Sequence, residues 1–176
     1  MSSLPFVDLA LVSGGLLIAR VVLGLLMAGH GAQKLFGWFG GHGLAGTAGF
    51  IESLGFRPGR PFALAAALSE FVGGLLLVLG FLGPVGPALV ISVMIVAALT
   101  VHRGHGVFAA SNGIEVPLLY ATGALALALT GYGAYSLDAL LGLTSLWTPA
   151  VSWVAIGLGI YGGLANLLMR RTPVTA

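Results

Sequence analysis

The fold of this chain is decided by the stretch from residue 9 to residue 33, which reads LALVSGGLLIARVVLGLLMAGHGAQ. Only one of these residues, Arg20, carries a full charge. An α-helix needs about 20 mostly apolar residues to cross the hydrocarbon core of a bilayer, which is about 30 Å thick. The stretch therefore predicts a membrane-spanning helix, which we place at residues 9–36.

Four further segments have the composition of spanning helices. They cover residues 61–82, 85–101, 117–133 and 149–169, and the apolar run that begins with Pro117, about residues 117–131, is the shortest of them. Between the first and second spans, apolar residues recur at helical spacing over 44–56. This pattern predicts an amphipathic helix that lies on the membrane surface.

These segments predict an all-α protein, a polytopic transmembrane helical bundle. Residues 9–138 would form a four-helix membrane domain, and residues 149–169 would add a fifth helix at its C-terminal side. The remaining parts are short: an N-terminal segment 1–8, a loop 139–148 and a tail 170–176.

The composition excludes a water-soluble domain. Charged residues make up 7% of the chain, against roughly 25% in soluble proteins. Such a chain cannot cover a surface that faces water, so its main partner is the lipid bilayer. The small excess of basic residues does not indicate nucleic acid, and the absence of cysteine excludes disulfides, thiol redox motifs and Cys-ligated metal. We predict no metal site.

Lys and Arg are distributed unequally over the predicted loops. With five spans, one face of the membrane receives the N-terminus, the link at Gly83 and the 132–147 loop, which contain no Lys or Arg. The other face collects all six basic loop residues: Lys34, Arg57, Arg60, Arg103, Arg170 and Arg171. Because cytoplasmic loops carry the excess of Lys and Arg, we expect the N-terminus outside and the C-terminus in the cytoplasm.

Arg20 and Glu70 are ionisable residues inside predicted spans, where such groups are costly and usually face a partner in the bundle. At ~1.5 Å per residue, Arg20 lies ~16 Å deep from one face and Glu70 ~14 Å deep from the other. In a core of ~30 Å these depths coincide, which predicts an Arg20–Glu70 pair. The pair would be either a structural clamp or a site for a polar substrate, a proton or a quinone carbonyl.

A second group of polar residues is expected near the cytoplasmic face. His30 and Lys34 are one turn apart on the first helix and share a side, His102 ends the third span, and Glu115 opens the fourth. Together they would form a polar vestibule that could hold a quinone or anion headgroup. A haem held by His30 and His102 is less favoured, because the chain has no c-type attachment motif.

An ordered series of motifs resembles the DoxX family. It runs from Arg20 through residues 29–37 (GHGAQKLFG), 54–56 (LGF) and 68–77 (LSEFVGGLLL), and then through 79–83 (LGFLG), His102, Gly113 with Glu115, and 131–138 (GYGAYSLD). The resemblance covers about residues 15–138 and implies a compact four-helix membrane core in a bacterial inner membrane, so the fifth helix goes beyond the family pattern.

The resemblance also implies a function and a set of residues. The family is named for a small subunit of a quinone-linked thiosulfate oxidoreductase, although most members have no assigned activity. The polar positions that match are Arg20, His30, Lys34, Glu70, His102, Glu115 and Asp138. Ser136 or Asp138 would cap a helical turn on the outer face by accepting its backbone N–H groups.

Three functional hypotheses follow, and none assigns a catalytic residue to the isolated chain. The preferred one is a quinone-proximal or redox-partner subunit of a membrane complex, whose polar interior is lined by Arg20, His30, Lys34 and Glu70. The second is a non-enzymatic scaffold that assembles other membrane proteins or copies of itself. The third is a small transporter of protons or polar solutes, which we rank lowest because the sequence lacks an internal repeat.

Overall fold

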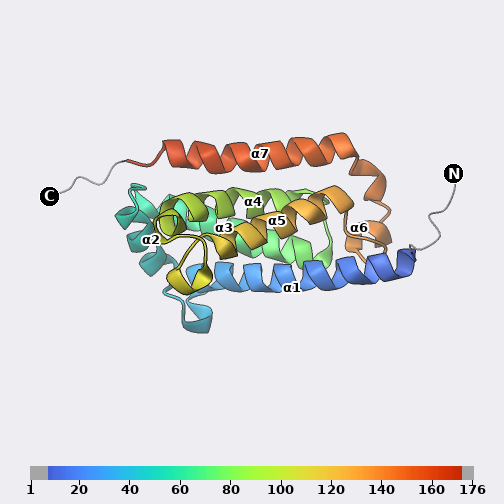
Figure 1. Cartoon of the computed structure of the whole chain (residues 1–176), viewed down its shortest axis with the longest axis horizontal. Helices are drawn as coiled ribbons and strands as arrows, with labels where there is room; N and C mark the ends of the chain where they lie inside the picture. Colours follow the sequence, from blue (N-terminus) through green and yellow to red (C-terminus); the bar gives the residue numbers. More distant parts are fainter. Residues whose placement is uncertain (1–7, 172–176) are drawn as a thin grey trace.

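We analysed a computed structural model of the chain, which describes residues 8–171. Seven α-helices occur in this range, together with short helical turns and no strand. Their bounds are α1 Leu9–Phe36, α2 Gly43–Ser53, α3 Gly59–Leu79, α4 Val85–Ala97, α5 Glu115–Thr130, α6 Leu137–Leu140 and α7 Pro149–Leu168. Figure 1 shows α1, α3, α4, α5 and α7 lying side by side along the long axis of the molecule. The all-helical bundle is as the sequence predicts.

Four of the helical segments are long and apolar enough to cross a membrane. They are α1, α3, α7 and the continuous segment Val85–His105, in which α4 is prolonged by a π-helical turn at Ala98–His102 and a short 3-10 turn. The fifth predicted span, α5, has only 16 residues, which corresponds to ~24 Å of helix.

Glycines hold α1 and α3 in close antiparallel contact. A Cβ on Gly24 would lie 2.6 Å from the Gly74 carbonyl oxygen, and a Cβ on Gly31 would lie 2.4 Å from the Phe71 nitrogen. No real Cβ sits that close to backbone atoms, so the two helices can approach this far only because these positions lack side chains. Small residues are the usual means of close packing in membranes, where lipid tails remove the hydrophobic drive between helices.

The remaining long helices pack around this pair. α4 lies against α3, α5 and α7, and Gly159 and Gly163 of α7 face the backbone at Ala88 and Ser92 of α4. This register makes α4 and α7 run in the same direction along one side of the bundle. Where the helices meet, the buried core includes Met27, Leu77, Val90, Ala124 and Ile156.

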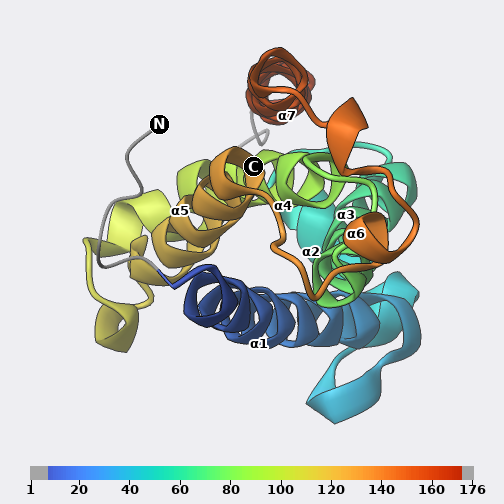
Figure 2. The same ribbon diagram turned by 90° about the vertical axis from the view of Figure 1, so that its right-hand side faces the viewer.

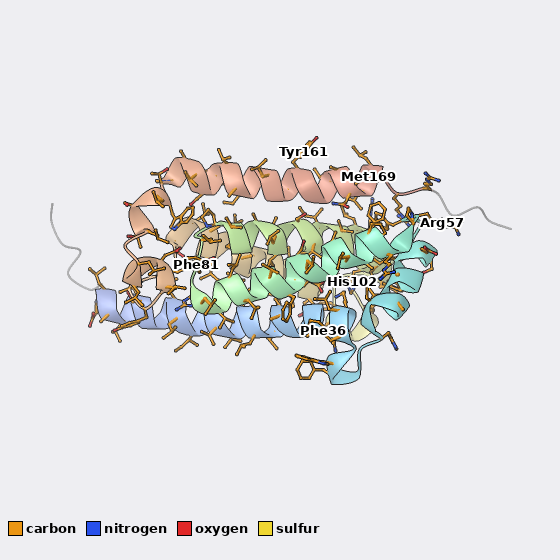
Figure 3. All side chains as sticks on the ribbon, turned by 180° about the vertical axis from the view of Figure 1, so that it is seen from behind. Phe36, Arg57, Phe81, His102, Tyr161 and Met169 are labelled. Carbon is orange, nitrogen blue, oxygen red and sulfur yellow. The ribbon has the colours of Figure 1, made fainter. Side chains whose placement is uncertain are left out.

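The two ends of the bundle differ in construction. At the end that we call the α2 end, α2 packs across α3 and α1, and the side chain of Arg170 donates to the carbonyl of Leu54. At the opposite end, the α6 end, the segment from Gly131 to Trp147 folds over the turn between α3 and α4 (Figure 2). Figure 3 places Arg57 and His102 toward the α2 end and shows Tyr161 on α7 pointing away from the other helices, where it is exposed.

Candidate functional site

Arg20 is buried, with 2% of its surface exposed, but its partner is not Glu70. Its guanidinium donates hydrogen bonds to the carbonyls of Leu77, at 3.1 Å, and of Val78, both in the last turn of α3, and to the carbonyl of Tyr135. The last carbonyls of a helix have no partner within the helix and carry its partial negative charge. Arg20 therefore caps the end of α3 from a neighbouring helix, and the predicted Arg20–Glu70 pair is wrong.

The register between α1 and α3 explains the error. The depth calculation assumed that both helices begin at the membrane surface, whereas the Gly24–Gly74 and Gly31–Phe71 contacts shift them along each other. In this register Arg20 reaches the last turn of α3, at the α6 end. Glu70, in the middle of α3, lies opposite the last turns of α1.

Glu70 instead pairs with Lys34. The Lys34 Nζ lies 2.5 Å from the Glu70 Oε2, and this is the only ion pair found among residues 8–171. The Glu70 side chain is 4% exposed and that of Lys34 is 30% exposed. The ammonium therefore connects the buried carboxylate to the surface of the bundle, and only one of its three N–H donors is used by the carboxylate.

An aromatic residue that the sequence analysis did not single out completes this cluster. The ring of Tyr120, on α5, meets the ring of His30 edge-to-face with centroids 5.8 Å apart. Both rings lie within electrostatic range of the Glu70 carboxylate. We call His30, Lys34, Glu70 and Tyr120 the Glu70 cluster. The sequence does contain a signal for Tyr120, which is a tyrosine inside an apolar segment. Placing a hydroxyl group there costs free energy unless the hydroxyl forms an interaction.

An apolar groove leads along the outside of the bundle to the Glu70 cluster. It lies between α1 and α5 and has a volume of about 510 Å³. Apart from Tyr120, its walls are aliphatic: Ile18, Ala19, Val22, Leu23, Leu26, Val116 and Leu119. Tyr120 lines the groove and also contacts His30, so this one residue belongs to both the groove and the polar cluster.

The predicted vestibule residues His102 and Glu115 are engaged with a loop instead. The Nδ1 of His102 is hydrogen-bonded to the carbonyl of Asn112 at 2.8 Å, and the Glu115 carboxylate accepts the N–H of Ala109 at 2.7 Å. These contacts order the connection between the Val85–His105 segment and α5. His30 and Lys34, which belong to the Glu70 cluster, do not share these partners.

Asp138 accepts hydrogen bonds from the α3–α4 turn and not from its own helical turn. Ser136 accepts the N–H of Ala139 and so caps α6, whereas the two Asp138 oxygens accept the N–H groups of Leu82 and Gly83 at 3.0 and 2.7 Å. The hydroxyl of Tyr132 donates to the Gly83 carbonyl at 2.5 Å. The α6 end is thus closed by side chains that satisfy the backbone of the α3–α4 turn.

The fold and these contacts define a small helical membrane protein in which Lys34 pairs with the buried Glu70, near an apolar groove between α1 and α5. The chain belongs to the DoxX family, whose family model matches residues 15–103, about half of the chain. It is 33% identical over 127 residues to the "Inner membrane protein YqjF" of Escherichia coli (strain K12), an alignment that covers 72% of this chain and 92% of that protein. No solved structure matches the chain. The family and the relative identify a protein of the bacterial inner membrane.

Proposed function

We propose that this protein is a membrane subunit that binds a lipid-soluble quinone at the Glu70 cluster and works with a redox partner protein. The observation that carries the proposal is that Tyr120 belongs both to the polar cluster that contains the Lys34–Glu70 pair and His30 and to the wall of an apolar groove. A lipid-soluble quinone has two parts that correspond to this site: an apolar tail for the groove and a polar head for the cluster.

Each part of the site has a defined task in this proposal. The aliphatic walls of the groove hold the tail, and free N–H donors of Lys34 and the hydroxyl of Tyr120 face the carbonyl oxygens of the head. Reduction of a quinone takes up two electrons and two protons. The partner protein supplies the electrons, and the Glu70 carboxyl, held in reach of solvent by Lys34, relays protons.

We further propose that the α2 end faces the cytoplasm. Five basic residues, Lys34, Arg57, Arg60, Arg103 and Arg170, belong to this end by sequence position or by contact, and cytoplasmic segments are enriched in Lys and Arg. The redox partner would then dock from the cytoplasmic side, where the Glu70 cluster is nearest.

Binding of decylubiquinone to the purified protein in lipid nanodiscs tests the proposal, with empty nanodiscs as the background. Glu70→Gln removes the charge while keeping the shape of the side chain, so we expect binding to weaken about tenfold, the effect of losing ~1.4 kcal/mol. Glu52→Gln is the matched control, because Glu52 accepts the N–H of Gly59 at the same end and lies outside the groove.

A second pair of variants tests the groove. Ala19→Phe adds a ring within the groove, whereas Leu25→Phe adds the same ring to an exposed position of α1 outside it. We expect only Ala19→Phe to weaken binding of decylubiquinone. The proposal fails if folded wild-type protein binds no more decylubiquinone than empty nanodiscs, or if both members of either variant pair behave alike.

A further inference from the structure

A cavity at the α6 end is separate from the groove and the Glu70 cluster. It has a volume of about 280 Å³ and shares no lining residue with the groove. Its walls come from the last turn of α5, the Gly131–Trp147 segment, the α3–α4 turn and the first turn of α7. At ~30 Å³ per water molecule the cavity holds about nine waters, or one small organic molecule.

The walls of this cavity present polar groups that the protein leaves partly or wholly unpaired. Asp138 is 2% exposed, and each of its oxygens receives one N–H; a carboxylate has about four acceptor positions, so half of them remain open. The indole Nε1 of Trp147 is buried and has no hydrogen-bond partner in the described part of the chain, and Ser152, which is 7% exposed, lines the same cavity. Buried polar groups without partners are costly, which indicates that a polar occupant completes the site.

The charge and the aromatic character of the walls narrow the chemistry of that occupant. The Asp138 carboxylate is the only ionisable group in the lining apart from the Tyr132 phenol, and no Lys, Arg or His lines the cavity. The guanidinium of Arg20 donates to the carbonyls of Leu77, Val78 and Tyr135 and makes no hydrogen bond to Asp138. Two further walls are the rings of Tyr132 and Trp147, and aromatic faces attract cations by the ring quadrupole.

We propose that this cavity binds a small organic ammonium group, held between the Asp138 carboxylate and the rings of Trp147 and Tyr132, with the hydroxyl of Ser152 as a further contact. The ammonium is either that of a free amine or that of an aminated lipid headgroup. The site is independent of the proposed quinone site, because the two share no lining residue and lie at opposite ends of α5.

Calorimetric titration of the full-length protein with choline tests this inference. The protein is held in nanodiscs of phosphatidylglycerol, which has no ammonium group, and neohexyl alcohol, the uncharged carbon isostere of choline, is titrated in parallel. We expect saturable binding of choline and about tenfold weaker binding of the isostere, as expected for a contact worth ~1–2 kcal/mol. Absence of choline binding to folded protein, or equal binding of the isostere, overturns the proposal.

Two variants locate the site while keeping Asp138, which caps the α3–α4 turn, in place. Trp147→Phe and Ser152→Ala should each weaken choline binding at least threefold, while their controls Trp153→Phe and Ser145→Ala, at exposed positions outside the cavity, should not. Thermal unfolding of each variant confirms that it is folded. If the controls and the cavity variants change binding equally, the site is elsewhere and the proposal is wrong.

The source of the ammonium group is distinguished by the lipid. When phosphatidylethanolamine replaces phosphatidylglycerol in the nanodisc, a headgroup that enters the cavity competes with choline and raises its apparent Kd. An unchanged Kd identifies a free amine as the ligand.

Discussion

Single side chains in this bundle form hydrogen bonds with backbone groups that the lipid of the bilayer could not satisfy. Arg20 serves three carbonyls and Asp138 serves two backbone N–H groups, and every such group is expensive to leave unpaired in hydrocarbon. The Lys34–Glu70 pair differs, because it is an ion pair between side chains and no backbone depends on it. The charged residues therefore divide into those that support the fold and those that are available for chemistry.

A double-mutant cycle separates these two uses. Lys34→Met leaves the Glu70 carboxylate buried without its counter-ion, which costs ~3–5 kcal/mol in comparable sites, and we expect the added Glu70→Gln to recover most of the loss. Arg20→Met should be destabilising as well, but its effect should add to that of Glu70→Gln within ~0.5 kcal/mol. The free energy of unfolding in mixed micelles is the measurement, and strong coupling between Arg20 and Glu70 would contradict the contacts described here.

The sequence identified these buried charges but not their partners. Arg20 and Glu70 stood out because ionisable residues are rare in spanning segments, and that reasoning needs only composition and position. The partner of each residue depends on how far α1 is shifted along α3. That shift is set by the contacts of Gly24, Gly31 and Gly74. The sequence pattern of one helix does not predict which of its glycines will contact the neighbouring helix.

At the scale of helices, the apolar runs of the sequence predict where the long helices lie, whereas details at the helix ends do not follow from them. Four of the five predicted spans are long and apolar enough to cross a membrane, and α5 is shorter. The hydrogen bonds of His102 and Glu115 to the loop before α5 were not predicted, because the choice between a polar vestibule and a locally ordered loop depends on backbone hydrogen bonds. A helix is observed within the predicted range 44–56, as α2 at Gly43–Ser53, and it packs on α3.

The α1–α3 contact yields a prediction with a control in the same helix. Gly31→Ala places a methyl group against the backbone of Phe71, and we expect overpacking of the kind that costs ~1–3 kcal/mol. Gly29→Ala meets no atom within 4 Å, so only helix propensity acts, and alanine exceeds glycine by up to ~1 kcal/mol. The unfolding midpoint in detergent should fall for Gly31→Ala and hold or rise for Gly29→Ala; equal midpoints would show that the two helices do not touch at Gly31.

For the whole molecule, the orientation in the membrane can be measured directly because the chain has no cysteine. Ser145→Cys places a thiol at the α6 end, and Ala110→Cys places one at the α2 end, both at exposed positions. If the α2 end is cytoplasmic, a membrane-impermeant maleimide should label only Ser145→Cys in intact cells. Ala110→Cys should react only after the membrane is opened, and the reverse pattern would invert the proposed topology.

The shortness of α5 has a consequence for the surrounding lipid. Its 16 residues span ~24 Å, several ångströms less than an average hydrocarbon layer of ~30 Å. A bilayer relieves such hydrophobic mismatch by thinning locally, so lipid headgroups and water descend further along α5 than along α1 or α7. This local thinning lies beside the groove that α5 shares with α1. It shortens the distance through the hydrocarbon layer that the polar head of an amphiphile must cross to reach Tyr120.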